Sequence, residues 1–268
     1  MKKRGFAVLL ALLLLLCGAA SAEIWRFGDE TVPKIAITVD DCYKKQHMAA
    51  ILDLCEQYGV PVTFFPVGLT IYEEDRELWQ RAVDLGCEIG NHTYSHTCLL
   101  EKVNYQQVRS QFIRMENALD TALGYHYEVQ LYRPPYGEAG KSNQYWSRYD
   151  KCGYFNVIKW SVSQTNFEKC IKQVKNGSIL LFHTNAKDVK CIEQLIPAVL
   201  EKGLTPVTVS ELLNLEPVVK ERTESELVFP PVSTSPTAQP ASTSTPAETT
   251  EPSRPASRNR PKPPRSER

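Results

Sequence analysis

Short apolar runs rich in β-branched residues alternate along the chain with longer stretches whose apolar residues recur at helical spacing. The run 34–39 (KIAITV) predicts a buried strand, and residues 105–123 predict a long amphipathic helix. Further strands are predicted at 60–67, 87–90, 131–133, 154–160, 178–182 and 205–209, and further helices at 46–58, 73–85, 143–151, 167–174 and 189–202. This alternation indicates βα units, and therefore a parallel sheet with helices outside it.

About seven such units in a domain of this length favour a single-domain α/β fold, a distorted (β/α) barrel. A flat doubly wound sheet is the alternative architecture. In both architectures we expect the chemistry of the protein at the carboxyl ends of the strands.

Residues 1–22 have the pattern of a secretory signal peptide. Basic residues at positions 2–4 precede an apolar run at 6–16, and Ala20-Ser21-Ala22 offers a small-residue cleavage site. The apolar run is too short to span a bilayer comfortably. We therefore expect a bacterial protein that is secreted or associated with the cell wall, with no stable membrane span after cleavage. An uncleaved anchor is the alternative.

Residues 217–268 are rich in Pro, Ser and Thr. They predict a disordered tail, because they offer too little apolar surface to offset the entropy lost on ordering. The tail ends in basic residues, opposed there by Glu267: Arg254, Arg258, Arg260, Lys262, Arg265 and Arg268. This basic end could bind an anionic polymer of the cell wall. A solubilising tail without a partner is the alternative.

The remaining residues, 23–216, form the predicted folded domain, which is long enough to bury a core. It carries 20 Lys and Arg against 25 Asp and Glu, a net charge of −5, which argues against a nucleic acid as the substrate. Outside the signal peptide the sequence has seven cysteines and no CxxC pair, so we expect no cysteine zinc site. One or two disulfides fit an exported protein, with at least one thiol left over, and the sequence assigns no pairs.

Acidic and histidine side chains follow two of the predicted strands. The first strand runs into Asp40-Asp41, two carboxylates that repel each other and require a positive partner. The third leads into His92 and His96, which would project from one face of a helical turn. With Asp41 they make a His-His-Asp set suited to Zn²⁺ or a similar divalent ion, with a position left for water. Taken alone, the acids could be a turn or a helix cap, and the histidines a chance pair.

Two more strand ends carry polar side chains. The sequence RPPYG (133–137) follows the fourth strand, and its prolines and glycine predict a rigid turn that fixes an arginine and a backbone N–H. The sixth strand ends in Leu181-Phe182-His183, whose alternation points Leu181 and His183 to the same side. A tight loop and a satisfied core histidine are the respective alternatives.

In these motifs the sequence resembles the polysaccharide deacetylases, carbohydrate esterase family 4. ITVDD (37–41) is similar to the family's first motif, NHTYSH (91–96) to its second, RPPYG to its third and LLFHT (180–184) to its fifth. The resemblance covers residues 32–213, and the order and spacing of the motifs agree. It implies metal-dependent hydrolysis of the N-acetyl amide of amino sugars in a polysaccharide, with release of acetate.

The resemblance also implies a role for each matching residue. Asp41, His92 and His96 would bind one divalent metal, Zn²⁺ first, although Co²⁺, Ni²⁺ or Mn²⁺ suits the same ligands. The metal would polarise the acetyl carbonyl and a bound water, and Asp40 would take the proton of that water as general base.

Further roles follow for the other two motifs. The backbone N–H of Tyr136 would hold the oxyanion, and His183 would protonate the leaving amine. Arg133 would orient Asp40 and keep it ionised. The pocket for the acetyl methyl group would be lined by Leu181, Trp160 and Pro135.

The sequence departs from the family at the fourth motif, where Ser163 and Asn166 stand in place of acids. Cys42 replaces the glycine that often follows the acid pair; it could add a soft ligand, react with oxidants, or be a packed thiol. We expect an enzyme whose N-acetylated glycan substrate is peptidoglycan, with chitin-like oligomers next. The alternatives are a catalytically impaired glycan-binding protein that keeps the fold and the metal, and a wall-anchored scaffold that works through its tail.

Overall fold

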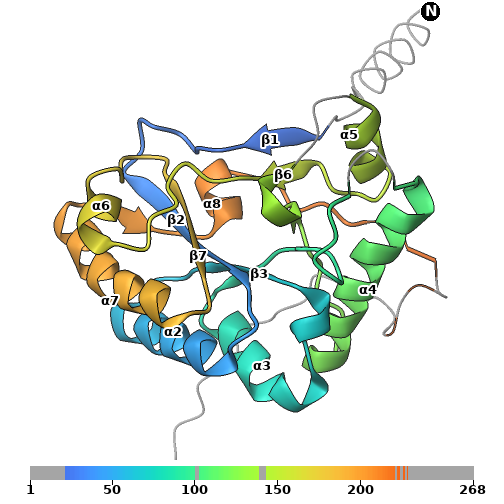
Figure 1. Ribbon diagram of the computed structural model, residues 1–268, viewed down its shortest axis with the longest axis horizontal. Helices are drawn as coiled ribbons and strands as arrows, with labels where there is room; N and C mark the ends of the chain where they lie inside the picture. The colour runs from blue at the N-terminus through green and yellow to red at the C-terminus, as the bar shows by residue number, and fades with distance from the viewer. Residues whose placement is uncertain are drawn as a thin grey trace, which may run out of the picture. The chain divides into compact units, whose positions relative to one another are not determined.

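A computed structural model of the chain describes residues 22–99, 103–138, 143–220, 222, 223, 226 and 228 (Figure 1). These residues fall within residues 1–232, the first of two units into which the chain divides. The predicted signal peptide up to residue 21 and the predicted basic end of the tail lie outside the described residues. Within the described ranges, none of the helices has the length and apolar character needed to cross a membrane.

The strands pair with one another in parallel. Their bounds are Glu23–Trp25 (β1), Lys34–Asp41 (β2), Thr63–Pro66 (β3), Glu88–Ile89 (β4), Leu131–Tyr132 (β5), Asn156–Ile158 (β6), Ile179–His183 (β7) and Thr205–Pro206 (β8). One sheet has the order β4-β3-β2-β7 with β8 beside β2, and the other has the order β1-β6-β5.

Two isolated bridges join these sheets into a barrel. Asn91, just beyond β4, pairs with Tyr132 of β5, and Val162, beyond β6, pairs with Leu180 of β7. The circuit β2-β3-β4-β5-β6-β7 therefore closes on itself, which confirms the predicted distorted (β/α) barrel over the flat doubly wound alternative. The barrel is irregular because β4 and β5 are each 2 residues long and the closing contacts are single bridges.

Helices cover the outside of the barrel (Figure 1). The α-helices are Lys45–Tyr58 (α2), Arg76–Asp84 (α3), Tyr105–Leu123 (α4), Asn143–Asp150 (α5), Phe167–Ile171 (α6), Ala186–Glu201 (α7) and Val209–Leu213 (α8), and the 3-10 helices are Gly68–Thr70 (η1), Glu73–Asp75 (η2) and Pro135–Gly137 (η3). The longest, α4, begins with a capping box in which Asn104 and Gln107 each accept the other's backbone N–H at 2.9 Å. α7 packs between α2 and α6 on one flank, and α3 packs against α4.

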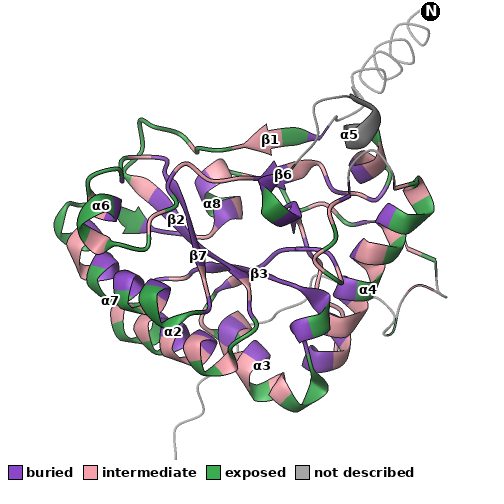
Figure 2. Ribbon diagram, in the orientation of Figure 1, coloured by how far each residue is buried: buried purple, intermediate pink, exposed green. Residues whose placement is uncertain are grey.

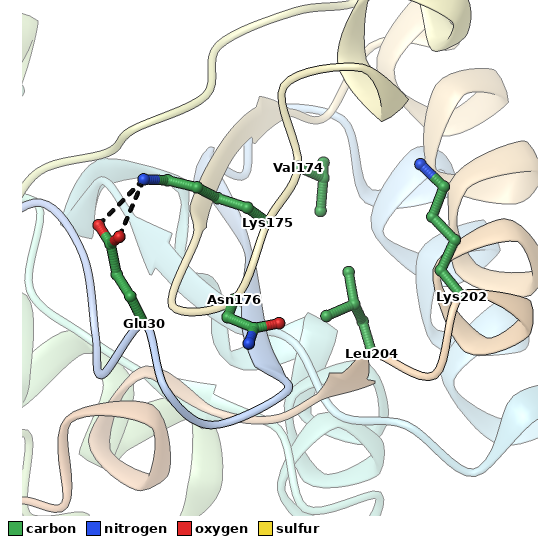
Figure 3. A pocket seen from close by; sticks show the side chains of 6 residues that line it. All are labelled: Glu30, Val174, Lys175, Asn176, Lys202 and Leu204. Carbon is green, nitrogen blue, oxygen red and sulfur yellow. Dashed lines mark hydrogen bonds and ion pairs between the residues drawn. The ribbon is translucent and has the colours of Figure 1, made fainter.

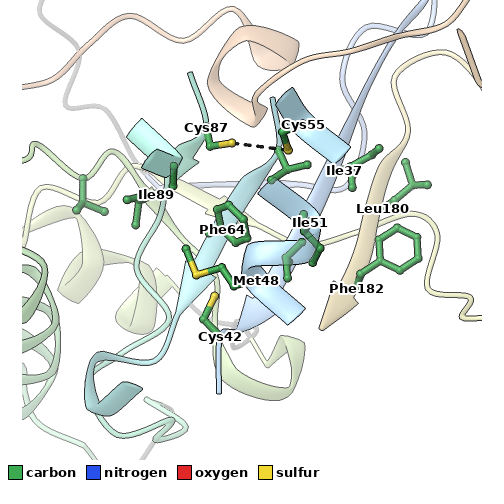
Figure 4. Close-up of a cluster of buried hydrophobic side chains, with 14 of the residues drawn as sticks. Ile37, Cys42, Met48, Ile51, Cys55, Phe64, Cys87, Ile89, Leu180 and Phe182 are labelled. Carbon is green, nitrogen blue, oxygen red and sulfur yellow. Dashed lines mark hydrogen bonds between the residues drawn. The ribbon is translucent and has the colours of Figure 1, made fainter. Parts of the chain in front are cut away.

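Apolar side chains fill the space between the barrel and its helices. Figure 2 shows the central strands as mostly buried and the outer faces of the helices as exposed. In Figure 4, Ile37, Phe64, Leu180 and Phe182 from neighbouring strands lie with Ile51 of α2 in one cluster. Each of these side chains contributes about 1.5–3 kcal/mol through burial. The packed strands therefore hold the side chains at their ends in fixed positions.

Most predicted elements are confirmed, and the differences lie mainly at their ends. α4 has the predicted bounds, whereas α7 begins at Ala186, earlier than predicted, and β3 is shorter than the predicted strand. β1 and α8 are not predicted by the sequence pattern. β1 has 3 residues, too few for a periodicity signal, and α8 begins at Val209, the last residue of the run predicted as a strand.

Ordered contacts continue past residue 216, where the folded domain is predicted to end. Lys220 is buried, and its Nζ lies 2.9 Å from Oε1 of Glu128 and 3.5 Å from Oε1 of Glu116. Arg222 also pairs with the buried carboxylate of Glu116. These ion pairs fasten the segment after α8 to α4, so the first residues of the predicted tail contribute to the fold.

Candidate active site

Strand β2 delivers both acids of the predicted pair to the carboxyl end of the barrel. Asp40 is 4% exposed and lies in register with His183 of β7. The backbone then turns sharply, because Asp41 and Cys42 have φ values of 68° and 61°. Left-handed backbone at two successive non-glycine residues is strained, and such strain gathers at functional sites. The turn brings both carboxylates close to the same imidazole, that of His92.

The two histidines come from a non-helical loop, so the predicted helical turn is wrong. Thr93 and His96 have φ values of 65° and 55°, which no helical turn contains. The buried Asn91 shapes this loop: its Oδ1 accepts the N–H of Thr93 at 2.9 Å, and its Nδ2 donates to the carbonyl of Phe112 at 3.2 Å. Side-chain hydrogen bonds thus replace the helical ladder and still bring the two imidazoles together.

Asp41, His92 and His96 form a cluster with the chemistry of a metal site. Oδ1 of Asp41 lies 3.4 Å from Nε2 of His96 and 3.6 Å from Nε2 of His92, and the three ligand atoms lie within 4.8 Å of one another. Among the described residues this buried oxygen has no hydrogen-bond donor. A buried, unsatisfied carboxylate oxygen that faces two imidazole nitrogens fits a divalent cation.

The buried His92 is prepared to act as a ligand. Its Nδ1 lies 2.7 Å from the carbonyl oxygen of Arg133, which can only accept a hydrogen bond. The proton therefore resides on Nδ1 and the lone pair of Nε2 faces the cluster. Burial lowers the pKa of His92, which keeps the imidazole neutral. Two imidazoles and one carboxylate are a donor set suited to Zn²⁺ and similar ions.

Arg133 is the positive partner of the acid pair. Its Nη1 donates to Oδ1 of Asp40 at 2.7 Å and to Oγ1 of Thr38 at 2.6 Å, and its Nε and Nη2 donate to the carbonyls of Ile158 and Lys159 at 3.3 and 3.1 Å. Burial lowers the pKa of Arg133, and the ion pair with Asp40 opposes this shift. The guanidinium therefore holds one oxygen of Asp40 in place, while the other oxygen faces the histidines.

The turn predicted after the fourth strand is present as η3. Tyr136 has a φ of 60°, and its ring packs edge-on against His96 with 4.7 Å between ring centroids. A Cβ at Gly137, where φ is 67°, would lie 2.6 Å from the ring of Trp160, so this position requires glycine. Pro135 is buried beside them. The turn thus brings the backbone of Tyr136 and the Trp160 ring to the same edge as the histidines.

Strand β7 presents the last two predicted site residues. Leu181 is 7% exposed, and the side chain of His183 is 44% exposed. Nδ1 of His183 lies 3.5 Å from Oδ2 of Asp188, an oxygen that also accepts the backbone N–H of His183 at 2.8 Å. Contact with Asp188 raises the pKa of His183, and the charges of Asp40 and Asp41 add to this effect, although burial opposes it. The contact with Asp188 therefore orients the imidazole of His183 and favours its protonated form.

Asp188 is the site residue that the sequence prediction missed. It is 1% exposed and lies in the first turn of α7. The signal was present: Asn185 caps α7 and accepts the N–H groups of Lys187 and Asp188, both at 3.1 Å, and its Nδ2 donates to Asp188 at 2.9 Å. An Asn followed three residues later by an acid is the pattern of a helix start. It would have placed Asp188 one turn from His183.

The segment that departs from the family's fourth motif brings no acid to the cluster. Ser163 is exposed, and Asn166 caps α6 by accepting the N–H of Lys169 at 3.0 Å. Cys42 is fully buried in the core near Met48 (Figure 4), and burial raises the pKa of its thiol. This agrees with the packed-thiol alternative for Cys42.

A separate surface hollow contains none of the predicted site residues. It is lined by Glu30, Val174, Lys175, Asn176, Lys202 and Leu204 (Figure 3). These residues precede β2, β7 and β8 or end α7, so the hollow lies at the amino-terminal ends of the strands. Lys175 is paired there with Glu30 at 3.0 Å. The candidate active site lies at the opposite, carboxyl-terminal ends of the strands.

Comparison with known proteins shows the family. A profile of the polysaccharide deacetylases matches residues 28–157. A peptidoglycan-N-acetylglucosamine deacetylase of Bacillus cereus is 30% identical over 201 residues, which cover 70% of this chain and 70% of the relative. A bifunctional xylanase/deacetylase of Pseudobutyrivibrio xylanivorans is 30% identical over 192 residues, 69% of this chain, and the match spans 31% of that relative. The chain belongs to the polysaccharide deacetylase family, as its motifs predict.

Solved structures share the fold. The crystal structure of the Bc1960 peptidoglycan N-acetylglucosamine deacetylase, in complex with 4-naphthalen-1-yl-N-oxidanyl-benzamide, is 28% identical, covers 74% of this chain and 95% of that chain, and has a TM-score of 0.62. A CE4 family pseudoenzyme from Bacillus anthracis is 20% identical, covers 72% of this chain and 69% of that chain, and has a TM-score of 0.63. At that identity the second likeness concerns the fold alone.

Proposed function

We propose that this protein hydrolyses the N-acetyl amide of N-acetylglucosamine residues in peptidoglycan and releases acetate, with the help of one divalent metal ion. The observation that carries the proposal is the unsatisfied Oδ1 of Asp41, which faces His92 and His96 beside the Arg133–Asp40 pair. Family membership supports the reaction class. Relatives in Bacillus cereus and Listeria monocytogenes that act on peptidoglycan support the substrate, with chitin-like oligomers as the second candidate.

Asp41, His92 and His96 would hold the metal. Zn²⁺ is the first candidate, and Co²⁺, Ni²⁺ and Mn²⁺ suit the same donors. When bound, such an ion supplies Lewis-acid polarisation of the acetyl carbonyl and of water. The proton transfers and the positioning are the work of the protein's own side chains.

Asp40 takes the proton from the attacking water. Arg133 holds Oδ1 of Asp40 at 2.7 Å, so the carboxylate keeps one orientation. Its Oδ2 lies 3.8 Å from Nε2 of His92, on the side of the residues that would hold the metal. A fixed carboxylate within reach of the water is what general-base catalysis requires.

The other residues act on the acetyl group and the leaving amine. The backbone N–H of Tyr136 donates a hydrogen bond to the oxyanion from a turn locked by Gly137. His183 gives its Nε2 proton to the amine nitrogen as the C–N bond breaks, and Asp188 holds Nδ1 of the same ring. The methyl group of the acetyl lies against Leu181, Trp160 and Pro135.

A glycan-binding protein with impaired catalysis is the second candidate. The exposed Ser163 and the helix-capping Asn166 favour it, since neither supplies the acid of the fourth motif. The Asp188–His183 pair weighs against it, because a protein that only binds glycan has no need of an oriented proton donor opposite a base.

The proposed substrate also indicates where the protein works. We propose that the protein is exported and works in or near the cell wall, where peptidoglycan is found. The basic residues at the end of the tail then favour contact with an anionic wall polymer. The chemistry described above uses no residue of the leader or of the basic end of the tail.

The test is acetate release by the full chain from peptidoglycan and from N-acetylglucosamine oligomers, with metal-stripped and zinc-restored protein side by side. We expect zinc-dependent release that is faster from peptidoglycan. Faster acetate release from the oligomers would contradict peptidoglycan as the preferred substrate and would still support the deacetylation reaction. No release from either polymer, with zinc bound, would favour the glycan-binding alternative.

A further inference from the structure

Four of the buried cysteines lie in two pairs far apart in the sequence. Sγ of Cys55 and Sγ of Cys87 are 4.0 Å apart, and the thiols of Cys170 in α6 and Cys191 in α7 are interacting neighbours. All four side chains are at most 4% exposed. A disulfide brings its two sulfur atoms to about 2.0 Å, so the thiols of Cys55 and Cys87 have to move about 2 Å closer to bond.

The first pair ties the end of α2 to the start of β4. Cys55 lies in the last turn of α2, and Cys87 directly precedes Glu88, the first residue of β4. Figure 4 shows the two sulfurs pointing toward each other across the core. Backbone contacts fix both residues, since the carbonyl of Cys55 accepts the N–H of Val60 at 3.1 Å and the N–H of Cys87 donates to Ala82 at 3.0 Å. This pair lies at the amino-terminal ends of the strands, away from the candidate active site.

The second pair ties α6 to α7. Cys170 lies in α6, and Cys191 lies one turn beyond Asp188 on α7. Sγ of Cys191 is also 3.8 Å from the carbonyl oxygen of Gln164, in the segment that replaces the fourth motif. A bond here would brace that segment against the helix that carries Asp188.

We propose that this protein, once exported, carries two disulfides, Cys55–Cys87 and Cys170–Cys191. The pairing leaves Cys42, Cys98 and Cys152 as thiols, which accounts for the odd number of cysteines outside the leader. The proposal rests on the export proposed above, because an extracellular location supplies the oxidising conditions in which such bonds persist. The proposal concerns the scaffold and does not depend on deacetylase activity.

The chemistry is thiol–disulfide exchange with a disulfide oxidant, such as oxidised glutathione or a disulfide oxidoreductase. A protein thiolate attacks one sulfur of the oxidant and releases one thiolate of it, and the second protein thiolate then displaces the other half. Two electrons and two protons leave each protein pair, and the oxidant becomes two thiols. A hydrogen bond from the neighbouring thiol lowers the pKa of Cys87 in one pair and of Cys191 in the other. Each pair thus has one sulfur suited to attack.

The test is to map the cysteines of the full chain after refolding with reduced and oxidised glutathione. The protein is denatured in excess alkylating agent without reductant and digested with trypsin. We expect peptide 46–76 joined to peptide 82–102, with fragmentation placing the link on Cys87 and the alkyl group on Cys98, and peptide 170–172 joined to peptide 191–202. Alkylation of all four cysteines before reduction, or pairing with Cys42, Cys98 or Cys152, would overturn the proposal.

Thermal unfolding gives a second, independent measurement. A reductant should lower the Tm of the oxidised protein by about 5–10 °C for each bond. The Cys170→Ser variant should lose one linked peptide and keep the other, whereas Cys152→Ser, a buried thiol outside both pairs, should keep both. The proposal would be contradicted by both measurements if the Tm were the same with and without reductant and no linked peptides were found.

Discussion

Oδ2 of Asp188, in the first turn of α7, lies 3.5 Å from Nδ1 of His183, the last residue of β7. The same oxygen accepts the backbone N–H of His183 at 2.8 Å. One buried carboxylate therefore fixes both the end of the strand and the orientation of its imidazole. Ser163 and Asn166 stand where the family's fourth motif has acids. The carboxylate beside His183 comes instead from Asp188 of α7.

Replacing this carboxylate should weaken the proton donor. We expect Asp188→Asn to lower kcat roughly 10- to 100-fold, because general-acid catalysis is worth about that much or more. Asp188 raises the pKa of His183, and the protonated form is the active one, so activity is lost as pH rises through that pKa. In Asp188→Asn the pKa falls, and the alkaline limb of the kcat–pH profile should move to lower pH.

The matched control lies on the outer side of the same helix. Glu193→Gln changes an exposed acid of α7 and should leave the profile unchanged. An alkaline limb that stays in place in Asp188→Asn would show that the carboxylate does not act through His183.

Metal binding should stabilise the fold through Asp41. A ligand at 100 times its Kd adds about 2.7 kcal/mol to stability, so zinc should raise the Tm of the metal-stripped protein. Asp41→Asn should abolish this rise, since it removes the charge of the oxygen that faces both imidazoles. Calorimetry with and without chelator provides the measurement. Asp40→Asn, the adjacent acid, should keep the rise; an equal rise in Asp41→Asn would contradict the ligand assignment.

The segment after α8 should be necessary for stability. Ending the chain after residue 216 removes Lys220 and Arg222 and leaves the carboxylate of Glu116 buried without its cations. Breaking a buried ion pair from one side costs about 3–5 kcal/mol, so Tm should fall sharply. A chain that ends after residue 232 keeps both cations and serves as the control. Equal Tm values for the two truncations would show that these pairs contribute nothing.

Gly137 should not tolerate alanine. The left-handed backbone alone costs roughly 1–2 kcal/mol for a residue with a Cβ, and that Cβ would also meet the ring of Trp160 at 2.6 Å. Gly137→Ala should therefore lower both Tm and kcat, because the turn that carries Tyr136 must shift. Gly86 also has left-handed backbone, with a φ of 75°, but a Cβ there would meet open space. Gly86→Ala should therefore lower Tm without lowering kcat. Equal losses of kcat in Gly137→Ala and Gly86→Ala would contradict the predicted clash with Trp160.

The fold could be predicted largely because its elements are regular. The alternation of β-rich runs with amphipathic stretches gives the barrel, and α4 has the bounds that the helical spacing of its apolar residues predicts. The C-terminal segment could not be predicted in this way. Lys220 and Arg222 lie in a stretch whose composition is that of a tail, and only the buried Glu116 on α4 makes them part of the fold.

The candidate site was predictable in its residues and less so in its geometry. The sequence NHTYSH indicates two clustered imidazoles, yet their closeness depends on left-handed residues and on hydrogen bonds from Asn91, which spacing alone does not reveal. Asp188 was not predicted because the motifs lie at the ends of strands. This carboxylate belongs to the following helix, α7, and contacts His183 from there. The helix-start pattern NAKD at 185–188 was the available signal.

The most direct measurement is the rate of acetate release from peptidoglycan by the zinc-loaded full chain and by its Asp40→Asn variant, with zinc content determined in both. We expect both proteins to hold one zinc ion. Release by the wild type should fall about 100-fold or more in the variant, because the base that takes the water proton is gone. Release at the same rate by both proteins, or none by the zinc-loaded wild type, would contradict the account.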